Sequence, residues 1–335
     1  MMTENTLAAF RHHGGRLSAA QTMFPSAPSP WIDLSTGISP YPWPGARADD
    51  LSALPDPDDI ADLEKAAATY FGCPDQPIAA LPGADMGLRL LPHILKARSV
   101  AIVSPTYQGH AEAWRDAGAD MNLISRNALA SVDAQVVVVV NPNNPDGEII
   151  TPSDLLALLQ RQQTRSGWLV VDESFADIMP EISVAAHAQR GLIVLRSFGK
   201  FFGLPGARLG FAIGDSAVIR AIRSVTGAWP VNADALHLGK GAYSDTSWHQ
   251  NTRVRLKADA ERLDSLLMDS GFAVCGGTSL FRLVSCADAE KVFLGLAAKG
   301  ILVRPFDYAS NWLRFGIPRA GQWTRVADAL RECRQ

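Results

Sequence analysis

Residues 196–211 read RSFGKFFGLPGARLGF and follow an apolar run, 192–195, that is typical of a buried strand. The stretch places Lys200 three positions after Ser197 and eight positions before Arg208. This spacing suits a pyridoxal phosphate site, because an amine must form an imine with the cofactor aldehyde while a hydroxyl and a guanidinium hold the phosphate. The stretch therefore predicts Lys200 as the imine lysine and Ser197 and Arg208 as phosphate ligands.

The other interpretation of Lys200 is a solvated surface lysine, the role expected of Lys65 or Lys96. An aromatic and glycine-rich loop differs from a charged helical face, and a desolvated lysine loses its proton more easily, as a nucleophile must. A Walker phosphate loop is excluded, because Phe201 follows Lys200 and position 194 is not glycine.

The composition is that of a globular protein with room for two domains: 335 residues, of which 47% are hydrophobic and 19% charged. A net charge of −3 with dispersed arginines predicts no nucleic-acid partner. The four cysteines form no CxxC pair, so neither a disulfide framework nor a metal site is expected. No stretch approaches the roughly 20 apolar residues of a spanning helix, and no signal core is visible, which predicts a cytoplasmic protein without a membrane partner.

The order of the expected elements predicts an α/β fold. Strand patterns at 99–103, 135–140, 168–171, 192–195 and 208–213 alternate with helical patterns from about residue 58, as a mainly parallel sheet covered by helices requires. Asp58 or Asp59 can cap the first of these helices, and Thr151 with Asp154 is typical of the start of another. The run 136–140 is apolar on both faces, so it is expected to be a central, buried strand. We expect a large cofactor-binding domain over 45–225. The arm 1–44, proline-rich from residue 24, and residues 226–335 are expected to form a smaller α+β domain.

Polar candidates follow four of these strands, and ligands in open α/β sheets bind at the carboxyl ends of strands. Asp172 could keep the cofactor's ring nitrogen protonated, or could simply cap a turn. Asn144 could donate to the ring hydroxyl oxygen and contact substrate, or belong to an ordinary turn. Tyr107 could stack on the ring, or merely pack there. With Lys200, Asp172 and Tyr107 are the predicted catalytic residues.

Two further anion contacts are predicted. Gly83, Ala84 and Asp85 precede a helical stretch, so their backbone amides could bind the cofactor phosphate at the positive end of the helix dipole. Arg314 lies within an apolar strand, which is costly unless an anion pairs with it. That anion could be a substrate carboxylate or phosphate, or an internal acid.

At this point the chain resembles the fold-type I pyridoxal phosphate enzymes of the class I/II aminotransferase family over nearly its whole length. The resemblance rests on the order of Pro82-Gly83, Tyr107, Asn144-Pro145-x-Gly147, Asp172-Glu173, Ser197-x-x-Lys200, Arg208 and Arg314. Within that family, the segments HGG (13–15), DLSTGISP (33–40), LPD (54–56) and LRFG (313–316) are most similar to the threonine-phosphate decarboxylases of cobalamin biosynthesis.

The resemblance implies decarboxylation of L-threonine O-3-phosphate to (R)-1-amino-2-propanol O-phosphate by a homodimer. The substrate phosphate would be held with the help of His13, Gly14 and Ser39, although a flexible arm accounts for these residues equally well. Phosphoserine fits the same pattern, since one methyl group is worth about 1–3 kcal/mol.

Two departures from the family pattern favour a decarboxylase over an aminotransferase. Phe175 and Leu54 stand where many of the aminotransferases have tyrosines that contact the cofactor. A histidinol-phosphate-type aminotransferase is nevertheless the alternative function. A non-catalytic pyridoxal-sensing module is a third interpretation, which the lack of a basic patch disfavours.

Overall fold

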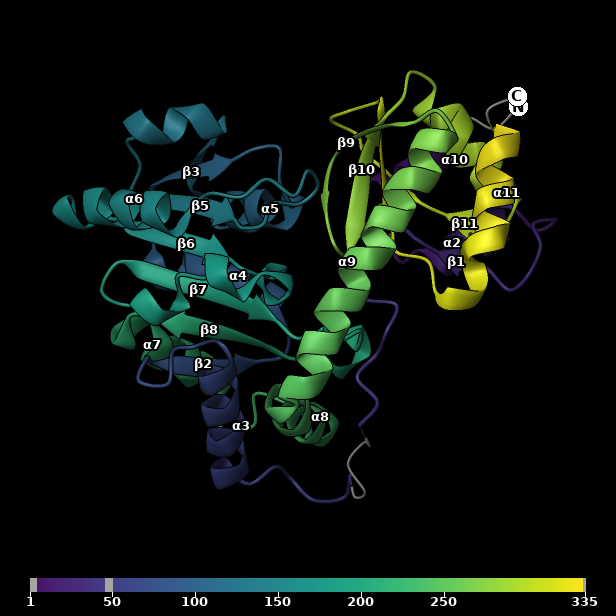
Figure 1. Cartoon of the computed structure of the whole chain (residues 1–335). Coiled ribbons are helices and arrows are strands. Elements are labelled where there is room, and N and C mark those ends of the chain that lie inside the picture. The colour runs from purple at the N-terminus through teal and green to yellow at the C-terminus, as the bar shows by residue number, and fades with distance from the viewer. Residues whose placement is uncertain (1–4, 46–50, 334–335) are drawn as a thin grey trace. The chain divides into compact units, whose positions relative to one another are not determined.

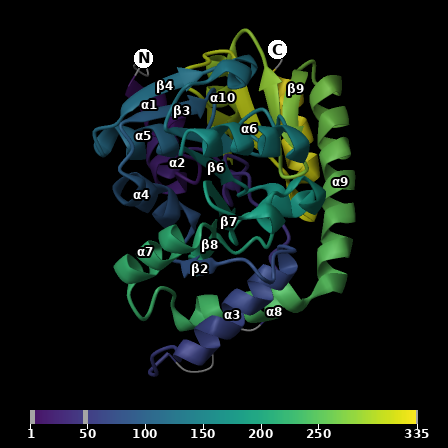
Figure 2. The ribbon, with the colours of Figure 1, turned by 90° about the vertical axis from the view of Figure 1, so that its left-hand side faces the viewer.

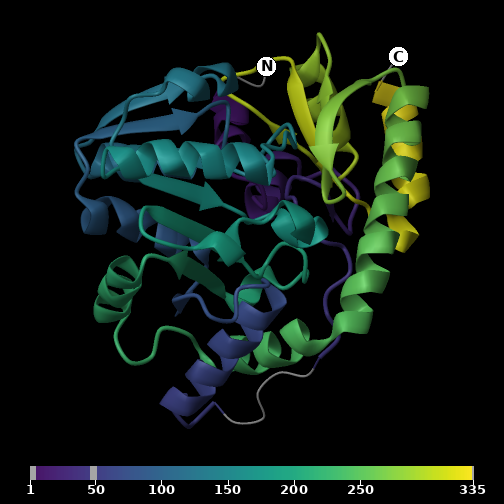
Figure 3. The same ribbon diagram turned by 60° about the vertical axis from the view of Figure 1, so that its left-hand side comes forward.

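The computed structural model describes residues 5–45 and 51–333 and contains two compact units (Figure 1). The larger unit is Pro42–His249, and the smaller comprises Met1–Tyr41 and Gln250–Gln335. We expected the divisions near residues 45 and 225. The second division lies later because α8 (Ala233–Ser244) packs along α3 (Pro57–Tyr70) in the larger unit (Figure 3).

The larger unit is built on a seven-stranded sheet. Its strand order is β2 (Ile78–Leu81), β8 (Gly210–Gly214), β7 (Leu192–Ser197), β6 (Trp168–Asp172), β5 (Val136–Val140), β3 (Ser99–Val103) and β4 (Asp120–Ile124). The five strands from β7 to β4 run parallel, whereas β8 is antiparallel to both of its neighbours. The predicted α/β fold with a mainly parallel sheet is confirmed.

Burial on both faces explains the centre of this sheet. All five valines of β5 are buried, because helices cover both sides of the strand. On one face α4 (Ala84–Leu95), α5 (Gln108–Asp116) and α7 (Ser216–Thr226) pack on the sheet through a shared apolar cluster (Figure 2). On the other side α6 (Pro152–Thr164) packs against β6.

Helix starts follow the capping rules. The Thr151 side chain accepts a hydrogen bond from the backbone N–H of Asp154 at 3.2 Å and begins α6, as predicted. The start of α3 differs from expectation. Asp56 rather than Asp58 or Asp59 is the cap, because Pro57 occupies the first helical position, where its missing N–H costs nothing.

The smaller unit has an antiparallel sheet in the order β12 (Arg304–Pro305), β13 (Trp312–Gly316), β10 (Phe281–Ser285) and β9 (Ala273–Thr278). A parallel pair joins β1 (Ile32–Asp33) to β11 (Ile301–Leu302). The helices of this unit are α1 (Asn5–Arg11), α2 (Leu17–Met23), α9 (Thr246–Asp269), which begins in the larger unit, α10 (Ala289–Ala298) and α11 (Trp323–Cys333). Leu7 and Phe10 of α1 belong to its core, so the arm is part of this unit. No helix among the described residues is long and apolar enough to span a membrane.

Candidate active site

The predicted residues of the larger unit lie where parallel strands end. Tyr107 follows β3 and precedes α5, Asn144 follows β5, Asp172 is the last residue of β6, and Lys200 comes three residues after β7. Because β3, β5, β6 and β7 are parallel neighbours, their carboxyl ends share one edge of the sheet (Figure 1). The four loops therefore meet at this edge, as the sequence predicts.

Asp172 is a buried carboxylate with three donors. Its Oδ2 lies 2.9 Å from Nε2 of His110, and its Oδ1 accepts bonds from the backbone N–H of Ser174 at 2.9 Å and from the Ser174 hydroxyl. Burial alone would raise the pKa of Asp172, but the hydrogen bond and charge of His110, together with the Ser174 bonds, lower that pKa below its ordinary value. The carboxylate is therefore charged at neutral pH, as a group facing a protonated ring nitrogen must be.

His110 is a site residue that the sequence analysis missed. It is 1% exposed and lies on α5, three positions after Tyr107, so one helical turn carries both side chains to the same edge of the sheet. That spacing was the available signal. A histidine in a helix is too common for the spacing to stand out without the position of Asp172.

Tyr107 is held by a hydrogen bond to α4. Its hydroxyl donates to Oδ1 of Asp85 at 3.3 Å, and Oδ2 of Asp85 accepts a bond from Arg89 at 2.9 Å. Burial, followed by the charge and hydrogen bond of Asp85, raises the pKa of Tyr107, so the phenol is neutral. Gly109 leaves room for the ring, since a Cβ there would lie 2.5 Å from it. A fixed aromatic face at this edge can stack on a flat cofactor.

The start of α4 forms an anion cradle with Arg208. Gly83 is the N-cap with φ of 96°, and a Cβ at Gly83 would lie 2.6 Å from the Arg208 guanidinium. A Cβ at Gly210 would lie 2.3 Å from the backbone nitrogen of Ala84. No described side chain caps this helix, so its first N–H groups and the guanidinium can bind one phosphate. Ser197 lies directly across from Gly210 in the β7–β8 pairing.

Lys200 lies on a loop anchored by aromatic packing. Its Nζ is 5.4 Å from the ring centre of Phe175, which is 4% exposed. Phe202 stacks on Phe198 with ring centres 4.7 Å apart, and its carbonyl accepts a bond from the N–H of Trp43 at 2.9 Å. The lysine is thus partly desolvated and presented from a rigid base.

The Asn144 loop is closed on itself. Asn143 donates to the Pro105 carbonyl at 2.9 Å and to Asp146 at 2.8 Å, and accepts from Thr106 at 2.7 Å. These bonds join the loops that follow β3 and β5. Asn144 itself is 7% exposed, and its contact with a cofactor or substrate stays a prediction.

Two buried arginines mark the smaller unit. Arg314 of β13 and Arg304 of β12 are directly paired across the sheet and are only 3% and 6% exposed. Arg314 donates to the Ser35 carbonyl at 2.9 Å, and Arg304 donates to the His12 carbonyl at 2.9 Å. Burial, and then the charge of Arg304, lower the pKa of Arg314, which means that the pair favours a bound anion. Arg304 was not predicted.

The predicted arm residues lie partly beside this pair. A Cβ at Gly14 would be 2.3 Å from the Ser35 carbonyl oxygen that Arg314 contacts, and His13 stacks on His12 with ring centres 5.5 Å apart. Ser39 is different. Its hydroxyl closes a local turn with Tyr41 at 3.2 Å, so its predicted substrate contact stays a prediction.

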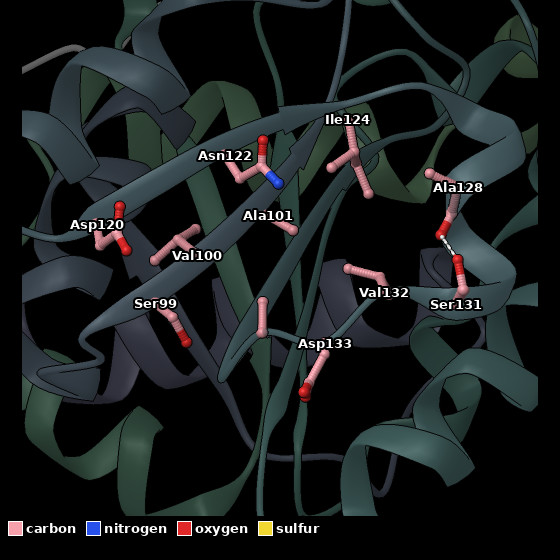
Figure 4. Close-up of a pocket in the computed structure, with 11 residues that line it drawn as sticks. Ser99, Val100, Ala101, Asp120, Asn122, Ile124, Ala128, Ser131, Val132 and Asp133 are labelled. Carbon is pink, nitrogen blue, oxygen red and sulfur yellow. Dashed lines mark hydrogen bonds between the residues drawn. The ribbon is translucent and has the colours of Figure 1, made fainter.

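A separate pocket of about 360 Å³ lies on the β3–β4 edge of the sheet (Figure 4). Its lining has two carboxylates, Asp120 and Asp133, and no basic side chain, so it does not suit a phosphate. None of the predicted site residues lines it. Elsewhere in residues 5–45 and 51–333, no group of three or more His, Cys, Asp or Glu side chains could hold a metal ion.

The residues of the larger unit fit pyridoxal phosphate. The cradle at Gly83 and Gly210 would be filled by any Cβ, the guanidinium and helix start suit a phosphate, and the charged Asp172 suits a ring nitrogen. Lys200 supplies the amine on the adjoining loop. The larger unit thus offers a suitable partner for the aldehyde, the ring nitrogen and the phosphate of that cofactor.

Comparisons with known proteins match residues 44–330 to the family "Aminotransferase class I and II". The threonine-phosphate decarboxylase of Pseudomonas aeruginosa is 40% identical over 95% of this chain and 96% of the relative. The enzyme of the same name from a Sinorhizobium species is 38% identical over 95% of this chain and 97% of the relative.

Solved structures agree on the fold. A histidinol-phosphate aminotransferase from Sinorhizobium meliloti in complex with pyridoxal-5'-phosphate has a TM-score of 0.81 at 19% identity, covering 95% of this chain and 94% of that one. The L-threonine-O-3-phosphate decarboxylase of Porphyromonas gingivalis has a TM-score of 0.76 at 18% identity, covering 90% and 98%.

Proposed function

Because this chain belongs to the aminotransferase class I and II family, we propose that it is a pyridoxal phosphate-dependent decarboxylase of L-threonine O-3-phosphate. The observation that carries the proposal is the arrangement of Lys200 and the Asp172–His110 pair on adjacent strand ends, in a chain 40% identical to a threonine-phosphate decarboxylase. The product is (R)-1-amino-2-propanol O-phosphate.

The residues of the larger unit would hold the cofactor at its polar ends. Lys200 would attach to the aldehyde carbon, and Asp172, kept charged by His110, would face the ring nitrogen. Arg208, Ser197 and the first N–H groups of α4 would bind the phosphate. Tyr107 would lie against the ring, and Asn144 would donate to the ring hydroxyl oxygen.

When bound, pyridoxal phosphate would supply the electron sink for the pair left on Cα when the substrate's carboxylate departs as carbon dioxide. Lys200, released from the aldehyde carbon once the substrate's amine has taken its place there, would move a proton from Nζ to Cα, where the proton replaces the departed carboxylate. The fixed base of its loop keeps Nζ at a constant place for this transfer.

The smaller unit supplies the grip on the substrate's anionic groups. Arg304 and Arg314 are two buried cations on paired strands, which suits the dianionic phosphate that distinguishes this substrate from an ordinary amino acid. Holding the phosphate firmly can turn the carboxylate out of the ring plane, so that remote binding energy selects the bond that breaks. His13 and Gly14 lie beside this pair and complete the proposed grip.

The test is the loss of both cofactor attachment and carbon dioxide release in Lys200→Ala. The bound cofactor's visible absorbance should lose its lysine-dependent band, and turnover should fall below detection. Lys65→Ala removes an exposed lysine of α3 in the same unit and should leave both readouts unchanged. A Lys200→Ala enzyme with substantial turnover would contradict the role.

A homodimer, a cytoplasmic location and a place in cobalamin biosynthesis belong to the same proposal. The resemblance to the decarboxylases supports the homodimer and the pathway, and four free cysteines suit a reducing compartment such as the cytoplasm. Light scattering of the purified protein tests the dimer. Rescue of a cobalamin-requiring strain blocked at this decarboxylation tests the pathway.

A further inference from the structure

The ends of β6 and β7 carry charged side chains on both faces of the sheet. Neighbouring residues in a strand point to opposite faces, so Glu173 points away from the side that Asp172 occupies. Arg196 is likewise adjacent to Ser197. Asp172 is paired with Leu195, which brings Glu173 level with Arg196 on the second face.

Arg196 binds two carboxylates on this second face. Its Nη1 donates to Glu173 at 2.8 Å, and its Nη2 donates to Asp177. The guanidinium also lies 4.4 Å from the ring centre of Phe71. The three charged residues are each at most 2% exposed, so solvent does not screen these contacts.

Glu173 extends the cluster into the segment that follows β6. Its Oε1 accepts a bond from the backbone N–H of Val184 at 2.7 Å, and its Oε2 accepts one from the Ser183 hydroxyl. The backbone N–H of Glu173 donates to the Leu195 carbonyl at 2.9 Å. A single carboxylate therefore joins β6, β7 and the loop that carries Phe175.

The neighbouring titratable groups are neutral. Burial raises the pKa of the Cys73 thiol to about 11, and burial raises the pKa of Tyr243 as well. Burial by itself would lower the pKa of Arg196, but the charges of Asp177 and Glu173 raise it. The cluster is thus one fixed cation between two carboxylates.

Stability alone is a weak reason for such a cluster. Replacing a buried ion pair by uncharged side chains of similar volume is often neutral or stabilising, because burying charges costs about as much as their attraction returns. The position of the cluster supplies a better reason. Glu173 is adjacent to Asp172, and Arg196 lies one residue before Ser197 and four before Lys200.

We propose that Arg196, Glu173 and Asp177 form a positioning unit that fixes Asp172, Ser197 and Lys200 relative to one another from the opposite face of the sheet. The proposal rests on the cofactor site of the proposed function and adds three residues to it, none of which touches the cofactor. The planar guanidinium of Arg196 bonds to two carboxylates at once, which fixes both the distance and the orientation between the ends of β6 and β7.

The test removes every charge of the cluster at once. In Arg196→Met/Glu173→Gln/Asp177→Asn no unpaired buried charge is left, so the apo protein should unfold within a few degrees of the wild type. The dissociation constant of pyridoxal phosphate, measured by titration of its visible absorbance, should rise about tenfold. The kcat of the saturated enzyme should fall about tenfold, because Lys200 is less well placed.

Arg196→Lys is the second variant, in case the triple variant does not fold. It keeps the positive charge but loses the planar fork, so it should bind the cofactor several-fold more weakly while remaining folded. Arg223→Met/Glu64→Gln is the matched control. It removes another ion pair of the larger unit, one that binds the backbone of β2 at the sheet edge and includes none of the predicted cofactor residues.

A triple variant with a changed melting temperature but wild-type cofactor affinity and kcat would overturn the proposal, and so would an Arg196→Lys variant with wild-type values. The control must keep its affinity. If the wild type itself fails to bind pyridoxal phosphate or to release carbon dioxide, the proposed function fails instead, so the two failures are distinguishable.

Discussion

Each unit of this protein buries arginine, but the two units surround it differently. In the larger unit Arg196 lies between the carboxylates of Glu173 and Asp177, which the chain itself supplies. In the smaller unit Arg304 and Arg314 lie directly opposite each other, and each donates to a backbone carbonyl, Arg304 to that of His12 and Arg314 to that of Ser35.

Arg196 and its two carboxylates therefore form an internal ion cluster, whereas the Arg304–Arg314 pair suits an anion that arrives from solution. Arg196 has carboxylate partners from its own chain and needs no external anion, so it can fix backbone positions. Two adjacent buried cations repel each other, and the lowered pKa of Arg314 reflects both this repulsion and its burial. Asp33 and Tyr308 offset only part of that cost. We therefore expect opposite responses when each cluster loses an arginine.

The largest effect should come from Arg196→Met alone. It leaves Glu173 and Asp177 buried without their cation, so the free energy of unfolding should fall by about 3–5 kcal/mol. Urea denaturation of the apo protein measures this. A change below about 1 kcal/mol would mean that the two carboxylates do not depend on Arg196, which would contradict its role as their buried counter-ion.

Arg314→Met should act on catalysis instead of stability. Losing one forked contact to the substrate anion should lower kcat/KM about 100-fold, equivalent to about 3 kcal/mol, mainly through KM. The free energy of unfolding should not fall in parallel, because the repulsion from Arg304 is relieved. Arg282→Met is the control, since Arg282 lies in the same sheet but pairs with Asp264 at 2.6 Å. Wild-type kinetics in Arg314→Met would contradict the assignment.

Inorganic phosphate should sharpen the comparison further. In cofactor-loaded protein the Arg208 cradle is filled, so added phosphate is expected to bind at the arginine pair. At 100 times its dissociation constant it should stabilise the fold by about 2.7 kcal/mol, seen as a rise in melting temperature. Arg304→Met/Arg314→Met should abolish the rise. A rise that persists in the double variant would place the anion elsewhere.

The smallest expected effect is on the pH dependence of stability and concerns Asp172. Asp172 and Glu173 lie at the end of β6 and point to opposite faces of the sheet. The folded pKa of Asp172 is lowered below 3.8, so ionised Asp172 stabilises the fold at higher pH, and this stability is lost as the pH falls through the folded value. The difference in unfolding free energy between wild type and Asp172→Asn should shrink as the pH falls from about 5 to below 3.8. A difference independent of pH would contradict the lowered pKa.

Local patterns in the sequence were sufficient for much of the fold. Thr151 with Asp154 predicted the start of α6, and the five valines of β5 predicted a buried central strand. Two edge strands were missed because their patterns are weak. β2 has two alanines among its four residues, and β4 has no buried residue and carries polar side chains at its first and third positions. Their pairing to β8 and β3 decides their structure.

Site residues could be predicted where a reactive side chain lies at the end of a strand. They could not be predicted where their role depends on a partner far away in the sequence. Asp172 ends a strand, and Lys200 and Tyr107 follow strands, which is where ligands bind in open α/β sheets. Arg304 became visible only through its register with Arg314, and His110 only through its contact with Asp172 across 62 positions of sequence. Periodicity within one element carries no information about such pairs.

The central claim is that this chain removes carbon dioxide from a phosphorylated amino acid. Mass spectrometry of the products from L-threonine O-3-phosphate and cofactor-loaded protein in D₂O, with and without a 2-oxo acid, tests it most directly. We predict aminopropanol phosphate with one non-exchangeable deuteron, formed equally without the oxo acid. A keto product that requires the oxo acid would contradict the account and identify an aminotransferase.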